Sequence, residues 1–536
     1  MQLFGTDGIR GEISESQSDD SSAIASLIEN RQVSPRLFRL IGEGIGATLT
    51  SDTEVVIGWD PRPRNHEFVQ GLTQGLHLRG VKVTWAGEVA TPGLQVSMLS
   101  RGASLGCMVT ASHNPVSDTG VKIFDSKGFK TMPEYESQIC DVIAKLSSEE
   151  REVDQPELLR ISTPDHEIDG NQLHLEILEK RFEQIKFCLA KGFEDLNIPS
   201  DGIAIDTSGG TAEKWLVDWL NLKGIPSYSV GNPDKLNENC GAGGLSPTDE
   251  WTWGNLEKQK EHLLISTLAV KCSNGMPVEW NHGDIVGAAL DGDGDRCLLV
   301  ETTEQGLRVI DGDRMADAII RSGGEHWKLA ASIETDLGLD VDYQTAVGDR
   351  WLSAALSPSL DLLSCENMPT LVGSEDSGHL VLAAPHPILE ENWSLVGDGI
   401  VTLLASLTAF KGLSGDSNNC FKRGWKKRVS IKGVDRKKWD GKNENAIEIE
   451  ELVNRVVSNW GDVSEWKNSD ISGETSLLLL EATVDGQALS IGVRNSGTEQ
   501  KTNASIRLSP EIAHLSENAL ELLNMIEEEL SLRLKQ

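Results

Sequence analysis

The sequence contains few basic residues, few aromatic residues and no long hydrophobic run. Its 536 residues include 83 acidic but only 49 basic side chains, so that the net charge is −34. Nucleic-acid binding requires Lys and Arg that neutralise phosphates, and we therefore expect no nucleic-acid partner. The longest apolar stretch, residues 400–410, is far shorter than the roughly 20 residues that cross a bilayer. We therefore expect no membrane partner either.

Cysteine pairs of the CxxC type are also absent, although the chain has eight cysteines. Scattered cysteines in a chain of this length indicate reduced thiols rather than a disulfide framework or a zinc site. The opening residues, MQLFGTDGIR, lack the basic segment and apolar run of a signal peptide. We accordingly expect a cytoplasmic protein.

Short apolar runs alternate with amphipathic helical patterns along most of the chain. This alternation favours an α/β fold, and the length predicts several domains. The expected strands are residues 55–59, 81–85, 107–110, 203–206, 288–290 and 298–301. The expected helices are residues 34–49, 68–79, 211–223 and 314–321, and residues 14–22, 147–170 and 411–419 look like linkers or surface insertions.

The strongest local motif places Asp291, Asp293 and Asp295 between two strand-like runs, with glycines between them. Glycine permits the tight backbone path that turns three carboxylates toward one hard cation, and Mg²⁺ prefers such oxygen ligands. A calcium-binding EF-hand loop does not fit, because Arg296 and Thr302 stand where that loop needs Gly and Glu. A plain acidic turn is disfavoured, because closely packed carboxylates repel one another without a cation.

A second motif, residues 109–115, carries Ser112 directly before His113 and follows an apolar strand. It lacks the G-x-S-x-G elbow of acyl-transfer enzymes, and by itself it could be an ordinary polar turn. Its partnership with the aspartate loop favours phosphoryl chemistry, because a divalent cation stabilises a transferring phosphoryl group.

Two further loops carry polar side chains beside glycine. The first, residues 373–379, could present its side chains to sugar hydroxyls, and the second, residues 494–499, combines an arginine with hydroxyls and a glycine. Such a combination forms a cradle for an anion, although either loop alone could be a capped turn. The candidate residues are Glu375, Ser377, His379, Arg494, Ser496, Gly497 and Thr498.

Taken together and in this order, the four loops resemble those of the α-D-phosphohexomutase superfamily, over essentially the whole chain. The resemblance implies four α/β domains around a central cleft, with three related mixed α/β domains and a C-terminal α+β domain. We expect these domains at residues 1–165, 166–285, 286–412 and 413–536, with the metal-binding and sugar-binding loops both in the third.

The resemblance also implies roles for individual residues. Ser112 would carry the phosphoryl group, with His113 and Lys122 as candidates for proton transfer. The metal ligands of Mg²⁺ would be Asp291, Asp293, Asp295 and the phosphorylated Ser112, with Arg296 beside the transferring phosphate and Arg10 reaching the serine. Sugar hydroxyls would be held by Glu375, Ser377 and His379, and the non-reacting phosphate by Arg494, Ser496, Gly497 and Thr498.

The activity implied is a transfer of phosphate between hexose 6-phosphate and hexose 1-phosphate, through a phosphoserine and a hexose bisphosphate intermediate. The opening FGTDGIRG and residues 237–241, with Pro247 beyond them, look most like phosphoglucosamine mutases, which act on glucosamine 6-phosphate. Phosphomannomutases and phosphoglucomutases share the other motifs. A Mg²⁺-dependent sugar phosphatase and a silent sugar-phosphate-binding protein remain the alternatives of other classes.

Three residues depart from the resemblance. Gln500 stands where the superfamily usually has proline, and Asn503 stands where it usually has a basic residue. Asp376 is an unusual residue in the middle of the sugar loop. We expect Lys501 or Arg507 to compensate for the missing basic residue, and the sequence does not indicate an oligomeric state.

Overall fold

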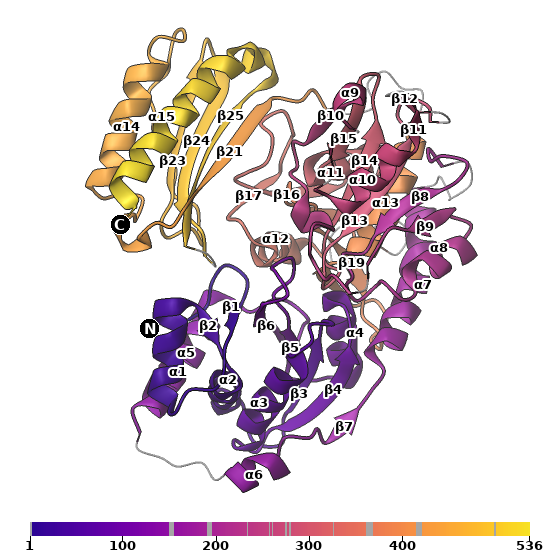
Figure 1. Ribbon diagram of the computed structural model, residues 1–536, viewed down its shortest axis with the longest axis vertical. Coiled ribbons are helices and arrows are strands. Elements are labelled where there is room, and N and C mark those ends of the chain that lie inside the picture. Colours follow the sequence, from indigo (N-terminus) through magenta and orange to yellow (C-terminus); the bar gives the residue numbers. More distant parts are fainter. Residues whose placement is uncertain are drawn as a thin grey trace.

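The chain folds into four α/β units, which follow one another along the sequence in Figure 1. The computed structural model describes residues 3–149, 155–189, 196–232, 234–256, 258–259, 261–273, 276–277, 280–324, 326–360, 368–413, 421–497 and 500–535. Within these residues no helix is long and apolar enough to cross a membrane, and the six cysteines that are described as free thiols form no disulfide.

The first unit is built on a seven-stranded sheet in the order β2-β1-β6-β5-β3-β4-β7. Its strands are β1 (Ile9–Ile13), β2 (Gln32–Val33), β3 (Glu54–Trp59), β4 (Lys82–Glu88), β5 (Leu105–Val109), β6 (Asp118–Asp125) and β7 (His166–Glu167). Its helices are α1 (Asp20–Asn30), α2 (Pro35–Ala47), α3 (Asn65–His77), α4 (Thr91–Arg101), α5 (Pro133–Ser147) and α6 (Gln155–Arg160). Ser34 begins α2, because its side chain accepts a hydrogen bond from the Leu37 N–H and Pro35 suits the first helical position.

The second unit contains a six-stranded sheet in the order β10-β15-β14-β13-β8-β9. These strands are β8 (Ile203–Asp206), β9 (Ser227–Ser229), β10 (Glu250–Thr252), β13 (Ile285–Leu290), β14 (Cys297–Thr302) and β15 (Gly306–Ile310), and β11 (Cys272–Ser273) pairs with β12 (Met276–Pro277). The helices are α7 (Gly170–Cys188), α8 (Leu216–Leu222), α9 (Trp253–Leu256) and α10 (Leu263–Val270).

The third unit contains a five-stranded sheet in the order β17-β16-β18-β19-β20. Its strands are β16 (Lys328–Ser332), β17 (Tyr343–Thr345), β18 (Leu371–Ser374), β19 (Leu380–Pro385) and β20 (Trp393–Gly397). Its helices are α11 (Gly312–Gly323), α12 (Asp349–Leu356) and α13 (Gly399–Gly412).

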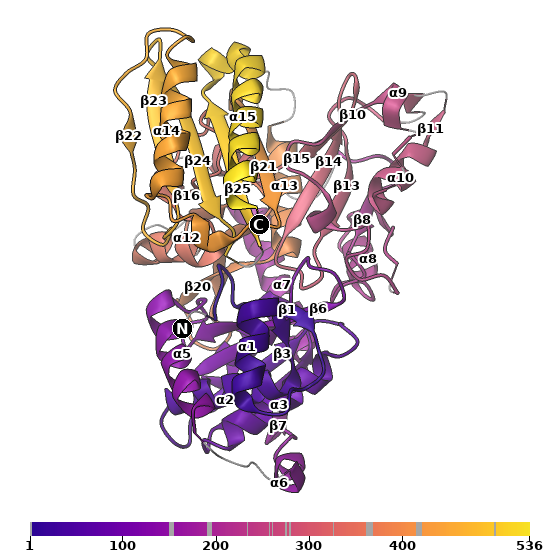
Figure 2. The ribbon, with the colours of Figure 1, turned by 60° about the vertical axis from the view of Figure 1, so that its left-hand side comes forward.

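The fourth unit has an antiparallel sheet in the order β21-β25-β24-β23-β22, and α14 and α15 cover one face of it (Figures 1 and 2). The strands are β21 (Trp425–Lys432), β22 (Lys467–Asn468), β23 (Leu478–Val484), β24 (Gln487–Asn495) and β25 (Lys501–Leu508). The helices are α14 (Glu444–Val457) and α15 (Ser516–Leu534). The expected fold class, with three related α/β units and a different C-terminal unit, is confirmed.

The first three sheets share one arrangement of five strands. The orders β4-β3-β5-β6-β1, β9-β8-β13-β14-β15 and β17-β16-β18-β19-β20 each contain two parallel pairs followed by two antiparallel pairs. The serine loop joins β5 to β6, the aspartate loop joins β13 to β14, and the sugar loop joins β18 to β19. All three loops therefore occupy the same turn of a repeated unit.

The boundary that we expect between residues 285 and 286 is wrong. β13, which begins at Ile285, pairs with β8 through Gly287, Ala288 and Ala289 and therefore continues the second sheet. A boundary before β13 would leave the buried backbone groups that pair it with β8 without hydrogen-bond partners. The aspartate loop consequently belongs to the second unit, and the third unit contributes the sugar loop alone.

Several expected elements differ in detail from the observed ones. α8 begins at Leu216 rather than at Thr211, since residues 211–215 form turns, and the Thr211 N–H donates to the Gly292 carbonyl, 3.1 Å away in the aspartate loop. The segment of residues 14–22, expected as a linker, contains the start of α1. Residues Glu250–Thr252, for which no strand is expected, form β10, which pairs with β15 at the edge of the second sheet.

The apolar cores divide the molecule differently from the sheets. Buried side chains of the second and third units form one continuous cluster, whereas the first and fourth units each have a cluster of their own. Among the buried apolar clusters of the described residues, a small one around Ile333, Leu477 and Leu479 joins the fourth unit to the third. The fourth unit is therefore a separately folded body, and such bodies commonly move as units.

The close packing of α2 on α3 predicts the effect of one substitution. A Cβ atom on Gly75 would lie 2.0 Å from the Arg39 carbonyl oxygen and 2.7 Å from the Glu43 nitrogen. We expect Gly75→Ala to lower the free energy of unfolding of the first unit by about 1–3 kcal/mol, because the two backbones must separate. Thermal and urea denaturation measure this change. Gly254→Ala is the matched control, since a Cβ there meets nothing within 4 Å, and an equal loss in both variants would contradict the packing argument.

Candidate active site

The serine loop holds Ser112 against the aspartate loop of the second unit. Ser112 has a left-handed backbone, with φ of 54°, and is fully buried. Its hydroxyl donates a hydrogen bond to Asp291 Oδ2 at 2.7 Å. Its carbonyl oxygen accepts from Arg62 at 2.9 Å and from Asn237 at 2.7 Å. Both the backbone and the hydroxyl of this serine are therefore fixed by groups far away in the sequence.

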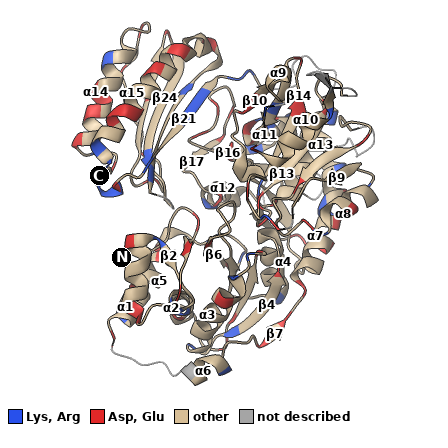
Figure 3. Cartoon of the chain, in the orientation of Figure 1, with Lys and Arg blue, Asp and Glu red and all other residues tan. Residues whose placement is uncertain are grey.

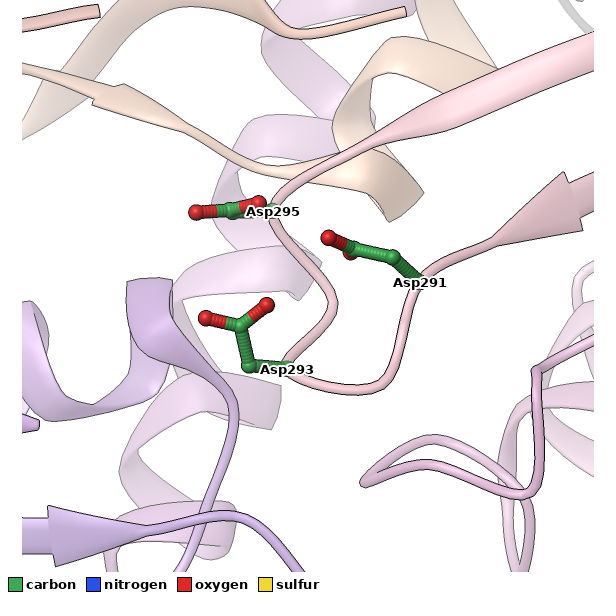
Figure 4. Close-up of side chains that lie close together, drawn as sticks. All are labelled: Asp291, Asp293 and Asp295. Atoms are coloured by element: carbon green, nitrogen blue, oxygen red, sulfur yellow. The ribbon is translucent and has the colours of Figure 1, made fainter. Parts of the chain in front are cut away.

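The three aspartates of the second loop lie close together, as Figure 4 shows. One oxygen from each of Asp291, Asp293 and Asp295 lies within 4.8 Å of the others, and all three side chains are buried. Asp293 Oδ1 and Asp295 Oδ1 receive no hydrogen bond from any described residue. Buried oxygens without hydrogen bonds are rare, and they suit a hard divalent cation such as Mg²⁺.

The electrostatics of the aspartate loop also suit a divalent cation. Burial, together with the neighbouring Asp295 and Asp293, raises the pKa of Asp291 to about 8. Burial would also raise the pKa of Asp295, but Lys122, His379 and Lys130 outweigh it and hold that pKa well below its usual range. The loop thus concentrates negative charge that only nearby cations make tolerable.

Lys122 on β6 supplies the nearest positive charge. Its Nζ lies 2.6 Å from Asp293 Oδ2 and 2.8 Å from Asp295 Oδ2, and the side chain is almost completely buried. Burial would lower the pKa of Lys122, but Asp293, Asp295 and Asp7 outweigh it and raise that pKa well above its usual value. Lys122 therefore carries a proton in this arrangement and neutralises part of the aspartate loop.

Arg10 reaches the backbone beside the serine rather than its hydroxyl. The guanidinium donates to the Ala111 carbonyl at 3.2 Å and to Asp7 Oδ2 at 2.6 Å. Asp7 also lies 2.9 Å from the Lys130 ammonium, which in turn lies 2.8 Å from Asp349 of the third unit. Lys130 and Asp349 lie outside every sequence motif and were not expected at the site, and Asp7 lies within the opening motif FGTDGIRG without an expected role.

His113 and Arg296 border the same charged cluster. His113 is mostly enclosed, and no described residue hydrogen-bonds its Nδ1. Burial, followed by the charges of Arg296 and Arg10, holds the pKa of His113 well below its usual value. The Nε of Arg296 lies 3.9 Å from Asp291 Oδ2 and 4.0 Å from Asp295 Oδ1, and its guanidinium is only partly exposed. Both side chains therefore lie near the serine and the aspartates.

The sugar loop meets the aspartate loop through His379. Its Nδ1 lies 3.8 Å from Asp295 Oδ1 and its Nε2 lies 3.1 Å from Asp349 Oδ2. Glu375 Oε1 accepts a hydrogen bond from the Gly348 N–H at 2.6 Å, and Ser377 is half-buried. The three expected sugar-binding side chains thus lie on one turn that contacts the aspartate loop and the start of α12.

The phosphate loop approaches from the fourth unit. A Cβ atom on Gly497 would lie 2.0 Å from Thr6 Oγ1, so this loop packs directly against the opening motif of the first unit. The Ser496 N–H donates to the Lys501 carbonyl at 2.9 Å, and Arg494 donates to Glu334 Oε1 at 3.0 Å. Thr498, the remaining expected residue, lies outside the described residues.

The neutral residue at position 503 has a defined place in the same sheet. Asn503 pairs with Arg494 across β24 and β25, and its Oδ1 accepts a hydrogen bond from Ser430 at 2.7 Å. Arg507, one of the residues expected to compensate, instead donates to the Thr335 carbonyl at 2.8 Å and to Ser490 at 2.7 Å. Its guanidinium is therefore already used to join the third and fourth units.

Comparison with known proteins identifies relatives along about three quarters of the chain. A family model described as phosphoglucomutase/phosphomannomutase, alpha/beta/alpha domain I, matches residues 1–150. Phosphoglucosamine mutase of Bacillus mycoides is 28% identical over 428 residues, which cover 76% of this chain and 78% of the relative. The enzyme of the same name from Corynebacterium aurimucosum is 28% identical over 429 residues, which cover 75% and 79%.

Solved structures show the same fold at lower identity. The pp63/parafusin phosphoglucomutase of Paramecium superposes with a TM-score of 0.62 at 15% identity, over 99% of this chain and 96% of that one. A phosphoglucomutase/phosphomannomutase family protein of Burkholderia thailandensis gives a TM-score of 0.57 at 16% identity, over 98% and 97%. The four-unit arrangement is thus shared over nearly the full length.

The geometry of the aspartate loop predicts a metal-binding defect. We expect Asp293→Asn to weaken Mg²⁺ binding at least about tenfold, since even outer partners of a metal site contribute 10- to 100-fold. Isothermal calorimetry with Mg²⁺ alone measures this change without any turnover. Asp340→Asn, at an exposed position, is the control and should bind Mg²⁺ like the unaltered protein. Equal affinity in both variants would place the metal elsewhere.

Proposed function

We propose that this chain, which is similar to phosphoglucosamine mutases and other members of the α-D-phosphohexomutase superfamily, interconverts hexose 6-phosphate and hexose 1-phosphate through a phosphoserine at Ser112 and a bound hexose bisphosphate. The single observation that carries the proposal is the hydrogen bond from the Ser112 hydroxyl to Asp291, 2.7 Å long, within a group of three buried aspartates. A phosphoryl group on that oxygen would lie directly beside the metal-binding carboxylates.

Asp291, Asp293 and Asp295 would hold Mg²⁺ together with an oxygen of the phosphorylated Ser112. When bound, this ion supplies positive charge that stabilises the transferring phosphoryl group. Arg296, whose guanidinium lies about as close to Asp291 as to Asp295, adds a second positive charge from the protein. The phosphoserine itself adds about −1.5 to −2 charges, which makes both cations necessary.

The reaction consists of two transfers that mirror each other. In the first, the bond between phosphorus and Ser112 Oγ breaks while a bond forms to the free sugar hydroxyl, and the proton of that hydroxyl passes to a base. The resulting bisphosphate turns over, and its other phosphate returns to Ser112 Oγ as a proton returns to the sugar oxygen. His113 and Lys122 are the candidates for these proton transfers, since both side chains lie at the serine and aspartate loops. His113, whose lowered pKa leaves its imidazole neutral, can accept a proton, whereas Lys122 carries a proton in this arrangement and can donate one.

Both orientations of the bisphosphate must fit the same phosphate loop. A general anion cradle on a separately folded unit satisfies this requirement, because the unit can adjust its position without disturbing the other cores. The contact of Gly497 with Thr6 places this loop over the opening motif. Closure of the fourth unit over a bound bisphosphate would exclude water and limit hydrolysis of the phosphoserine.

We propose glucosamine 6-phosphate as the preferred substrate, with glucosamine 1-phosphate as the product, in the cytoplasm. The support is the name carried by the relatives that are 28% identical, together with the resemblance of the opening FGTDGIRG and of residues 237–241 to phosphoglucosamine mutases. Mannose and glucose phosphates are the alternative substrates. A Mg²⁺-dependent sugar phosphatase and a silent sugar-phosphate-binding protein are the alternative functions.

Turnover with Mg²⁺ and a trace of hexose bisphosphate tests the proposal. We expect glucosamine 6-phosphate to be isomerised faster than glucose or mannose 6-phosphate. Ser112→Ala should lose at least about 10³-fold in kcat, because it lacks the oxygen that carries the phosphoryl group. Mass spectrometry of the unaltered protein should find a phosphate on the peptide that contains Ser112.

Ser117→Ala is the matched control, since Ser117 lies on the same loop but is exposed. It should retain full turnover. Release of inorganic phosphate without isomerisation would support the phosphatase instead. Sugar-phosphate binding without any turnover would support the silent binder, and equal activity of both serine variants would remove Ser112 from the mechanism.

A further inference from the structure

The carboxylate of Glu334, which follows β16, is held by two arginines from different strands of the fourth unit. Arg494 on β24 donates to Glu334 Oε1 from Nη2 at 3.0 Å and from Nε at 3.3 Å. Arg428 on β21 donates from Nη1 to the other oxygen, Oε2. The two guanidinium groups therefore grip one oxyanion from two sides, which is the arrangement that also binds phosphate oxygens.

Both arginines project from the same face of the fourth sheet. The register pairs Arg428 with Ser505 and Asn503 with both Ser430 and Arg494, and residues paired across antiparallel strands share a face. The alternate residues of these strands lie in the core beneath α14 and α15, among them Ile431, Val493, Ala504 and Ile506. The face that carries the arginines is thus the one turned away from the helices.

This face closes a small cavity against the second and third units. The cavity has a volume of about 80 Å³ and is lined by Glu334, Arg428, Arg507, Asp376, Lys426 and Thr248, among others. Arg428 is 37% exposed, whereas Arg494 is 10% exposed. A ligand can therefore reach Arg428, which is not sealed within the protein. Figure 3 shows the basic colour along β21, in contrast to the acidic surface of α14.

The neighbouring cations of β21 and β25 are already engaged. The Lys426 ammonium lies 2.7 Å from Asp313 and 3.1 Å from Asp376 of the sugar loop, and this contact gives the unusual Asp376 a role. Arg507 donates to Thr335 and Ser490. Within the described part of the chain, Glu334 is the one carboxylate within 4.0 Å of Arg428. Arg428 therefore has fewer acidic partners than Lys426, and unlike Arg507 it is exposed.

We propose that Arg428 binds the non-reacting phosphate of the substrate together with Arg494, and that Glu334 competes with this phosphate for the two guanidinium groups. This inference rests on the proposed function of the site. A phosphate group carries more negative charge than a carboxylate and offers three oxygens to two planar forks. Asn503 lies on the same face between the two arginines and supplies no charge. Arg428 therefore supplies the positive charge that the basic residue usual at position 503 would provide.

The proposal predicts opposite effects for the two partners. Arg428→Gln should raise KM for glucosamine 6-phosphate roughly 10- to 100-fold with little change in kcat, because a charge-assisted hydrogen bond is lost from both the ground and transition states. The inhibition constant of inorganic phosphate should rise by a similar factor. Glu334→Gln should lower both KM and that inhibition constant several-fold, because the competing carboxylate is gone.

Two further variants separate binding from folding. Arg455→Gln, at an exposed position of α14, removes the same charge from the fourth unit and should leave KM unchanged. Arg428→Gln combined with Asn503→Arg should recover much of the affinity, because the new guanidinium lies on the same face beside Arg494. Thermal denaturation of each variant identifies any that is not folded.

Direct binding makes the test independent of catalysis. Calorimetric titration of glucosamine 6-phosphate and of inorganic phosphate into Ser112→Ala, with and without Arg428→Gln, measures the affinity of the phosphate site. This measurement needs no turnover of a hexose phosphate. A tenfold or larger loss of affinity supports Arg428, whereas its absence in a folded variant overturns the inference. Failure of turnover in the unaltered protein would instead count against the proposed function alone.

Discussion

Mutual repulsion among the buried carboxylates of Asp291, Asp293 and Asp295 is the constraint on which the rest of the site depends. Three such groups within 4.8 Å of one another are tolerable only if positive charge surrounds them. Lys122 and Arg296 supply part of that charge, and Asp7 and Lys130 extend the network to Asp349 in the third unit. The need to compensate these aspartates thus joins three units at one point.

The repeated sheet explains how loops so far apart in the sequence reach that point. Each of the first three units places its functional loop between the third and fourth strands of the same five-stranded arrangement. Units of one design packed around a common centre therefore present equivalent turns to one another. The serine, the aspartates and the sugar loop are three versions of one structural position, each given different chemistry by its own sequence.

The fourth unit is joined to this assembly mainly by charge. Its core is separate, and the pairs of Lys426 with Asp313, and of Arg494 and Arg428 with Glu334, cross to the third unit. Ionic contacts can exchange partners when an anionic ligand arrives, whereas a shared apolar core cannot. In the proposed reaction, the unit that would accept either end of a bisphosphate is therefore the one that the protein holds by exchangeable contacts.

The sequence by itself determined the α/β fold class, the aspartate loop and the serine loop, because glycine spacing and strand-like flanks are local signals. It also indicated Glu375, His379 and Arg494 from short motifs. Only the tertiary structure decided that β13 belongs to the second sheet, that Lys130 and Asp349 complete the charge network, and that Arg428 shares Glu334 with Arg494. Strand pairing and long-range ion pairs join residues that are far apart in the sequence, as Gly287 is from Ala204 and Lys130 is from Asp349. No local pattern of residues encodes such contacts.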